Sequence, residues 1–334
     1  MRIPTRPAHL GLALALLSGV GLAGCTTETE EPVSVGLITK QEENPYWVTM
    51  KDVAQATADE LDATLTTATG TSDTDVASQE TAVRDMVADG VDGILITPTD
   101  PEALAPVIEE ARAAGVLVIA LDTPPASEDG VDAFFATDNE RAGRSVGEYA
   151  AAKVAELGLE PQVVTLDLAP GISSGELRRA GFLEGFGLAE DDPAVVASVD
   201  TEGDRDDAAV LMTRVLDEHP DVNVVYTVNE PAALGALAAL AEAEVDLDQV
   251  VVVSVDGGCR AMREAVRPGD IDATATQYPQ NMAREGVRAV VAAVREGQAP
   301  SGYLDTGSEL VSDQPAPGVE SRRVEFGIRT CWGS

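Results

Sequence analysis

The stretch that decides the fold is Val250-Val251-Val252-Val253-Ser254-Val255, which runs directly into Asp256. A short run of β-branched residues is typical of a strand that is buried in a parallel sheet. The carboxylate that follows then lies at the carboxyl end of this strand. In open α/β sheets, ligands bind in the crevice outside these strand ends. The stretch therefore predicts both an α/β fold and a binding residue, Asp256.

Four further apolar stretches also lead to polar side chains. Residues 35–38 lead to Asn44, residues 116–121 run into Asp122, residues 222–226 reach Asn229, and residues 271–276 run into Gln277. Amides and carboxylates provide the donors and acceptors that several hydroxyl groups need. The aromatic pair Tyr46-Trp47 is close in sequence to the first of them. We therefore predict a site for a small polyol such as a sugar.

The same β-branched runs alternate with Ala-rich amphipathic stretches, which favours α/β architecture with parallel sheets. Residues 48–61 are an example that we expect to form a helix, and a second unit of the same kind begins near Asp138. The chain of 334 residues is long enough for two domains with their own cores. We predict two doubly wound parallel-sheet domains that face each other across a cleft.

The charge of the chain excludes one class of partner. It has 58 acidic and 22 basic residues, which gives a formal net charge of −36. Binding to nucleic-acid phosphates independently of sequence needs a surplus of Lys and Arg. We therefore expect no nucleic-acid partner, and we interpret the acidity as a solvated surface.

The first residues indicate export. Arg2 and Arg6 precede an apolar segment, residues 10–22, and this segment ends in Leu22-Ala23-Gly24-Cys25. These features predict a lipoprotein signal peptide over residues 1–24, a lipidated Cys25 and a polar tether over residues 25–32. The alternative is an ordinary secretory signal with a chance cysteine. We expect contact with the membrane through the lipid anchor only.

The two other cysteines are Cys259 and Cys331. In an exported chain paired cysteines usually form a disulfide, although two separate buried thiols are an alternative. We expect no metal site, because the sequence has no Cys-x-x-Cys motif and no histidine cluster. We also expect no cofactor, because the Gly-rich segments fit neither the dinucleotide fingerprint nor the phosphate loop.

Binding is favoured over catalysis. His219 is the one histidine after the signal peptide, and it lies in the polar stretch 217–221, so nucleophilic schemes that use a histidine are not available. Asp122 and Asp256 could in principle hydrolyse a glycoside. Their neighbours do not indicate the raised pKa that the acid partner would need. We therefore predict that the protein is not an enzyme.

Seven motifs occur in the order and at the spacings of a known family. They are Asn44-Pro45-Tyr46-Trp47, Ile96-Thr97-Pro98-Thr99-Asp100, Leu121-Asp122, Ala136-Thr137-Asp138-Asn139, Ala180-Gly181-Phe182, Val228-Asn229-Glu230 and Val255-Asp256-Gly257. From about residue 33 to residue 311 the chain resembles the periplasmic sugar-binding proteins of ABC importers, of the ribose-binding type. Asn229-Glu230-Pro231, Gln277-Tyr278-Pro279 and the tail with Cys331-Trp332-Gly333 are most similar to the fructose-binding branch.

The resemblance implies the type I periplasmic-binding-protein fold, in which two Rossmann-like domains are joined by three crossings of the chain. The N-terminal domain would comprise residues 33–137 plus 278–310, and the C-terminal domain residues 138–277 plus 311–334. The hinge would lie near Thr137, Gln277 and Leu310. The family's crossings would also return the tail to the second domain, where Cys331 could meet Cys259.

The resemblance also assigns roles in the site, each beside a plainer alternative. Asn44 would cap the sugar while Tyr46 and Trp47 stack on its apolar face, Asp122 and Asp256 would accept hydrogen bonds from hydroxyl pairs, and Asn229 and Gln277 would donate and accept. The aromatic pair could instead be core packing, either aspartate could be a turn residue, and Asn229 could be a helix N-cap.

Three positions depart from the ribose-binding pattern. Thr123 replaces an Arg beside the first aspartate, and Glu176 replaces a second Arg. Two buried carboxylates need compensating donors. We expect Arg178 to supply them, with Arg205 as a poorer candidate. An aromatic residue of the second domain aligns near Gly203, so the pocket could admit a larger hexose.

The leading hypothesis is an exported, lipid-anchored receptor at the outer face of the bacterial cytoplasmic membrane. It would act as a monomer and deliver fructose, or ribose or mannose, to an ABC permease. A sensor that presents sugar to a receptor is the second hypothesis, and the sequence does not separate the two. An extracytoplasmic enzyme acting on sugars is a third, which the lack of a catalytic motif disfavours.

Overall fold

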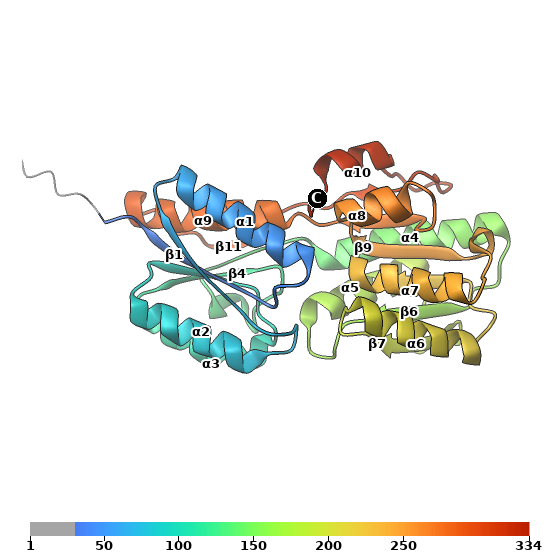
Figure 1. Cartoon of the computed structure of the whole chain (residues 1–334), viewed down its shortest axis with the longest axis horizontal. Coiled ribbons are helices and arrows are strands. Elements are labelled where there is room, and N and C mark those ends of the chain that lie inside the picture. The colour runs from blue at the N-terminus through green and yellow to red at the C-terminus, as the bar shows by residue number, and fades with distance from the viewer. Residues whose placement is uncertain (1–30, 334) are drawn as a thin grey trace, which may run out of the picture. The chain divides into compact units, whose positions relative to one another are not determined.

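The computed structural model describes residues 31–333 of the chain (Figure 1). The chain divides into Met1–Glu31 and Pro32–Ser334, and all the helices and strands below belong to the second part. The predicted signal peptide and Cys25 lie outside the described residues. None of the helices described is long and apolar enough to cross a membrane.

The first sheet contains six parallel strands in the order β11-β5-β4-β3-β1-β2. Their bounds are β1 Ser34–Thr39, β2 Thr64–Thr69, β3 Gly93–Ile96, β4 Leu117–Leu121, β5 Ala133–Ala136 and β11 Gly302–Asp305. The second sheet has the order β12-β10-β9-β8-β6-β7, and all its strands are parallel except β12. These strands are β6 Val163–Asp167, β7 Val195–Asp200, β8 Val224–Thr227, β9 Val251–Asp256, β10 Ala273–Thr276 and β12 Leu310–Val311. The predicted fold class is confirmed.

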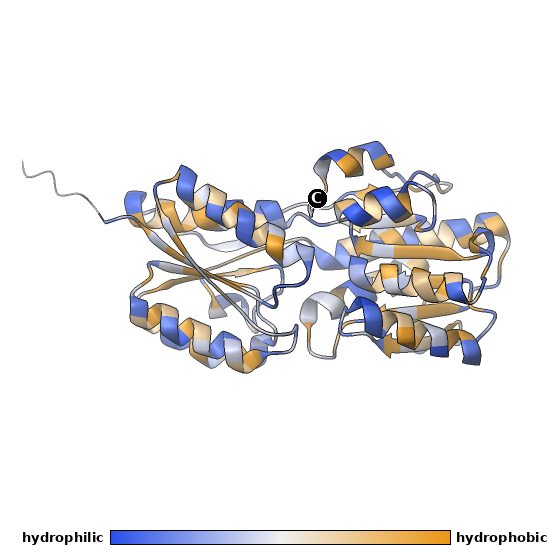
Figure 2. Cartoon of the chain, viewed as in Figure 1, coloured by the Kyte–Doolittle hydropathy of each residue, from blue (hydrophilic) through white to orange (hydrophobic). Residues whose placement is uncertain are grey.

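Helices cover both faces of each sheet, because each sheet has an apolar core on either side. The core of the first sheet is shared with α1 (Pro45–Glu60) and α9 (Pro279–Glu296) on one face and with α2 (Val76–Asp89) and α3 (Pro101–Ala113) on the other. The core of the second sheet is shared with α4 (Asn139–Leu157) and α5 (Ser173–Phe186) on one face. On its other face lie α6 (Arg205–Glu218), α7 (Glu230–Glu242), α8 (Cys259–Ala261) and α10 (Val324–Thr330). In Figure 2 the strands are mainly hydrophobic and the helices are mixed, as amphipathic helices require.

The chain passes between the two sheets three times. The first crossing lies between β5 and α4, the second between β10 and α9, and the third between β11 and β12. The crossings are bonded to one another: the Thr137 hydroxyl donates to Gly307 O at 3.2 Å, and Gln277 Nε2 donates to Asn139 Oδ1 at 2.8 Å. We predicted that the first domain extends to residue 310. In the structure Leu310 itself pairs with Ala275 in the second sheet.

Helices α4 and α5 approach each other through glycines. A Cβ atom on Gly143 would lie 1.9 Å from Arg178 O, and one on Gly181 would lie 2.0 Å from Glu140 O. Any larger residue at these positions would push the backbones apart. The glycines therefore set the depth at which α5 places Arg178.

The predicted bounds of the first helix are wrong by three residues at its start. We expected residues 48–61, whereas α1 begins at Pro45. Asn44 Oδ1 accepts a hydrogen bond from Tyr46 N at 2.9 Å, and proline is favoured at the first helical position. This cap brings Tyr46 and Trp47 into the first turn of the helix.

Candidate functional site

Arg178 of α5 lies between two aspartates that come from different sheets. Its guanidinium nitrogens are 3.7 Å from Asp122 Oδ1 and 3.3 Å from Asp256 Oδ1. The side chain is further fixed by bonds of 2.8 Å to Asn139 Oδ1 and 2.9 Å to Val228 O. All three charged side chains are buried, with about 5% of their surface exposed. The expected compensating cation is thus beside both carboxylates, whereas Arg205 is exposed at the start of α6.

Both aspartates have an unusual backbone conformation. Asp122 follows the last residue of β4 with a φ of 62°, and Asp256 is the last residue of β9 with a φ of 102°. Residues other than glycine rarely adopt positive φ, and when they do, they cluster at functional sites. The sharp turn at each strand end directs both carboxylates toward Arg178.

Tyr46 joins this cluster from α1. Its hydroxyl lies 2.9 Å from Asp122 Oδ1 and 2.9 Å from Gln277 Oε1. A phenol has one proton, so it satisfies only one of these acceptors at a time. Burial, with the charge of Asp122, raises the pKa of Tyr46 well above its usual value, so the hydroxyl stays a donor. The other acceptor is therefore left without this proton.

Lys40 and Asp73 are two charged residues of the site that the sequence analysis missed. Lys40 is 1% exposed and its Nζ lies 5.6 Å from the ring centre of Trp47. Asp73 Oδ1 and Trp47 Nε1 are buried and have no hydrogen-bond partner among the described residues. Lys40 directly follows β1, so its position behind a strand end could have revealed it. Asp73 lies in a loop with no such signal.

The remaining predicted residues have structural partners. Asn44 and Asn229 cap α1 and α7, and Asn229 Nδ2 also donates to Gly203 O at 3.0 Å. The side chain of Asn229 therefore makes the contacts of a helix N-cap, which was the alternative to a role in sugar binding. Thr123 donates to Asp122 Oδ2 at 3.1 Å. Tyr46 and Trp47 belong to the core of the first sheet and also face the aspartates.

Burial changes the acidity of two neighbouring acids. It raises the pKa of Asp256 to about 6, although Arg178 opposes the change. Burial and the charge of Asp256 raise the pKa of Glu230 to about 7. Glu230 is the first residue of α7, and its backbone N–H donates to Asp256 Oδ2 at 3.4 Å. Burial therefore makes the charged forms of these two acids costly, and hydroxyl donors from a ligand would reduce this cost.

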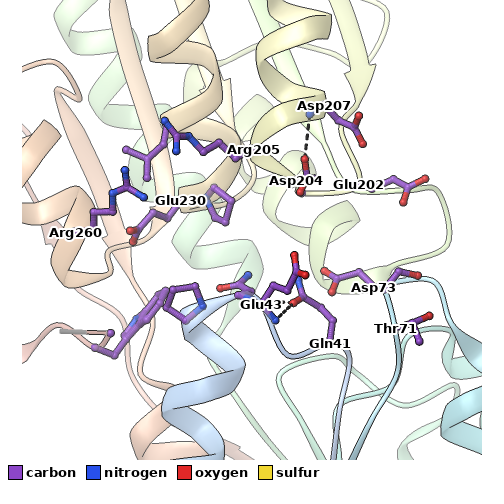
Figure 3. A pocket seen from close by; sticks show the side chains of 18 residues that line it. Gln41, Glu43, Thr71, Asp73, Glu202, Asp204, Arg205, Asp207, Glu230 and Arg260 are labelled. Carbon is purple, nitrogen blue, oxygen red and sulfur yellow. Dashed lines mark hydrogen bonds between the residues drawn. The ribbon is translucent and has the colours of Figure 1, made fainter.

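The space around these residues is small, but it adjoins a larger one. Lys40, Trp47, Asp122, Arg178 and Asp256 line a space of about 20 Å³, which is room for about one water molecule. Asn44 and Asp73 line this space and also a cavity of about 440 Å³ (Figure 3). In this conformation the polar residues of the site therefore bind mainly one another.

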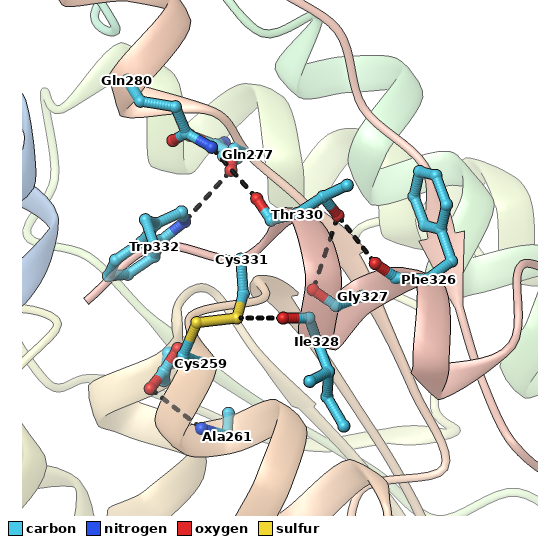
Figure 4. The surroundings of a disulfide bond; sticks show 11 residues. Cys259, Ala261, Gln277, Gln280, Phe326, Gly327, Ile328, Thr330, Cys331 and Trp332 are labelled. Atoms are coloured by element: carbon cyan, nitrogen blue, oxygen red, sulfur yellow. Dashed lines mark hydrogen bonds between the residues drawn. A yellow bond between two sulfur atoms is a disulfide. The ribbon is translucent and has the colours of Figure 1, made fainter. Parts of the chain in front are cut away.

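The predicted disulfide between Cys259 and Cys331 is confirmed. Their Cα atoms are 4.9 Å apart, and Cys259 N donates to Trp332 O at 2.8 Å. Trp332 Nε1 donates to Gln277 O at 3.0 Å (Figure 4). The ring of Trp332 also meets that of Tyr46 edge to face at 5.1 Å. The tail therefore brings an aromatic residue to the site that the sequence analysis did not include.

Comparison with known proteins decides the family. Residues 35–299 match the periplasmic binding protein domain. The chain belongs to the periplasmic binding protein family. It is 30% identical over 318 residues to the D-ribose/D-allose-binding protein of Pseudomonas aeruginosa, a match that covers 89% of this chain and 97% of the relative. It is 32% identical over 280 residues to the ribose import binding protein of Escherichia coli, covering 84% and 89% of the two chains.

A solved structure agrees with these relatives. A carbohydrate transporter solute-binding protein of Agrobacterium radiobacter, in complex with D-arabinose, has a TM-score of 0.77 and 28% identity, and the match covers 85% of this chain and 96% of the other. The resemblance to the ribose-binding type is confirmed, and so is the prediction of a solute-binding protein rather than an enzyme. None of these three proteins is named for fructose.

Proposed function

We propose that this protein captures a monosaccharide outside the cell and delivers it to an ABC permease. Fructose is the first candidate, on the resemblance of the motifs around Asn229, Gln277 and the tail. Ribose and mannose are the next candidates. The names of the relatives support a ribose-like or allose-like sugar as well.

The observation that carries this proposal is the position of Arg178 between Asp122 and Asp256. One cation and two carboxylates at strand ends of both sheets provide strong donors and acceptors for adjacent hydroxyl groups. A sugar bound there would contact both domains. Its binding would therefore favour an arrangement of the two domains that a permease can distinguish from the sugar-free one.

A sugar panel tests the proposal. Fructose, ribose, allose and mannose are added to the purified mature protein, and the midpoint of thermal unfolding is measured, since a ligand of the native state raises it. Calorimetry then gives the affinity for the sugar with the largest shift. Asp256→Ala should weaken this binding by about 2–4 kcal/mol, because it removes a charge-assisted contact.

Asp217→Ala is the matched control, because Asp217 is an exposed acid near the end of α6. It should leave the affinity unchanged. An unchanged affinity in Asp256→Ala, with the sugar identified, would contradict the assignment of the pocket. No response to any sugar of the panel would contradict the proposed function.

The lipid anchor is a separate part of the proposal. It rests on the Leu22-Ala23-Gly24-Cys25 motif alone. In a bacterial host fed labelled palmitate, the wild-type protein should become labelled and sediment with membranes. The Cys25→Ala variant should remain unlabelled, and equal labelling of both proteins would overturn the assignment.

A further inference from the structure

The cavity beside the sugar residues is large and polar. Its volume is about 440 Å³, within the range of about 300–1,000 Å³ that is typical of small-molecule sites. Figure 3 shows Gln41, Glu43 and Asp73 on one side and Glu230 and Arg260 opposite them. The cavity therefore has walls from both domains and continues from the predicted monosaccharide site through Asn44 and Asp73.

Glu230 gives this cavity a buried acceptor. The residue is 8% exposed, and Oε1 accepts a hydrogen bond from Ala261 N at 3.2 Å. Its other oxygen, Oε2, is buried without a hydrogen-bond partner in the part of the chain that the structure describes. An unsatisfied buried acceptor costs free energy, so a donor from a ligand is favoured there. The carboxylate of Asp73 lies on the facing wall, beside Gln41 and Trp47.

The other groups of the cavity complement these acceptors. Arg260 is exposed at the cavity and supplies donors, while Trp332 and Pro231 supply apolar surface. The disulfide holds Trp332 in place through its neighbour Cys331. Acceptors, donors and an apolar wall together are what a second sugar ring needs, since a ring has polar hydroxyl groups and apolar C–H faces.

We propose that the 440 Å³ cavity is a second sugar subsite and that the preferred ligand is a disaccharide or glycoside. One ring is held by Asp122, Arg178 and Asp256 after the side chains around their 20 Å³ space move apart. The next ring donates hydroxyl hydrogens to Glu230 and Asp73. This inference rests on the proposed function, because it places the first ring in the monosaccharide site. It extends the substrate class from free monosaccharides to sugars that are substituted at one hydroxyl.

Calorimetry with matched sugars tests the subsite. Fructose is compared with sucrose and lactulose, and mannose with mannobiose, each titrated into the full mature protein. We expect at least one disaccharide to bind tenfold or more tightly than its component monosaccharide. Arg260→Ala and Glu230→Gln should each remove most of this advantage. Arg260→Ala should leave the monosaccharide affinity within twofold, because Arg260 is not among the residues around the two aspartates.

Glu218→Gln is the control, since it removes an exposed acid at the end of α6 outside the cavity. It should change neither affinity. If a monosaccharide binds and no disaccharide binds more tightly, the subsite is overturned while the proposed function stands. If the advantage persists in both cavity variants, the subsite is again overturned. If no sugar binds at all, the proposed function fails and the subsite with it.

Discussion

Trp332 donates its indole N–H to the main-chain carbonyl of Gln277 at 3.0 Å. The two residues are 55 positions apart, one in the C-terminal tail and the other at the second crossing between the sheets. The disulfide attaches the tail to Cys259, three residues beyond Asp256. The tail around Trp332 is therefore bonded to the second crossing and borders the candidate site.

Reducing the disulfide should destabilise the protein and loosen Trp332. The bond joins residues 72 positions apart, which corresponds to about 4 kcal/mol in the chain-entropy model. The midpoint of thermal unfolding should fall by several degrees when a reductant is added. Trp332 and Trp47 are the two tryptophans of the chain, so a Trp47→Phe background isolates the fluorescence of Trp332.

The double variant Cys259→Ser, Cys331→Ser controls for other effects of the reductant. It should melt at the lower temperature whether or not the reductant is present. Equal midpoints for the oxidised and reduced wild-type protein would show that the bond does not form or does not stabilise the fold.

Removing the charge of Arg178 should both destabilise the protein and abolish sugar binding. Arg178→Ala leaves Asp122 and Asp256 buried without their cation, and breaking a buried ion pair in this way costs about 3–5 kcal/mol. Urea unfolding measures the loss. Arg178→Lys is the matched variant: it keeps the charge but loses the forked geometry, so it should recover stability more than affinity. A stable Arg178→Ala protein with normal sugar affinity is the contrary result.

Adding one methyl group at Gly143 should disturb the site from a distance. The new Cβ atom would lie 1.9 Å from Arg178 O, so α4 and α5 must separate, at a cost of about 1–3 kcal/mol. Arg178 moves with α5, and sugar affinity should fall as well. Both quantities are measured by denaturant unfolding and calorimetry on Gly143→Ala.

Gly286→Ala is the control for the same substitution in another helix. The atoms nearest to a Cβ atom there would be side-chain atoms of Leu95, at 3.0 Å, rather than backbone atoms. A side-chain end can move, and alanine favours the helix over glycine by about 1 kcal/mol. Gly286→Ala should therefore be neutral or mildly stabilising. Equal effects of the two substitutions would argue against close backbone contact as the cause.

The free energy of unfolding without ligand should decrease between pH 5 and pH 7.5. Burial raises the pKa of five acids: Asp167 and Asp256 to about 6, Glu230 and Asp272 to about 7, and Asp73 above its usual value. In this window the folded protein binds more protons than the unfolded chain, so raising the pH favours unfolding. The midpoint of thermal unfolding should be higher at pH 5 than at pH 7.5.

The Asp272→Asn variant measures how much Asp272 contributes to this pH dependence of stability. Asp272 Oδ2 accepts a hydrogen bond from Val252 N at 2.8 Å, and an amide oxygen can replace it. The variant should lose less stability between the two pH values than the wild-type protein. A midpoint that rises from pH 5 to pH 7.5 in the wild type would contradict the prediction.

The periodicity of the sequence was sufficient to predict the two α/β domains, whereas the three crossings followed from the family resemblance. The predicted strand is β9 (Val251–Asp256), and it is buried along its whole length, as is typical of β-branched strands in a parallel sheet. Cap residues set both ends of α2: Asp75 caps its start and Gly90 ends it. The start of α1 was missed because Asn44 was interpreted as a ligand residue, although its side chain caps the helix.

The site was only partly accessible to the same reasoning. Residues at strand ends, such as Asp122 and Asp256, follow from local sequence, because parallel strands bring their carboxyl ends to one edge of a sheet. Lys40 likewise follows directly after β1, so the same reasoning could have identified it as a site residue. Asp73, Glu230 and Trp332 come from a loop, a helix start and the tail. Their distances to the site depend on contacts between segments far apart in the chain.

The sequence by itself determined the two parallel sheets, the positions of the carboxylates behind their strands and the family. Tertiary structure alone decided how deep Arg178 lies, which acids share the large cavity and how Trp332 contacts the second crossing. Local propensity acts over a few residues, so it sets strands and caps. The depth of Arg178 is set by Gly143 against its backbone, and the place of Trp332 by the disulfide, and both contacts exist only after the chain has folded.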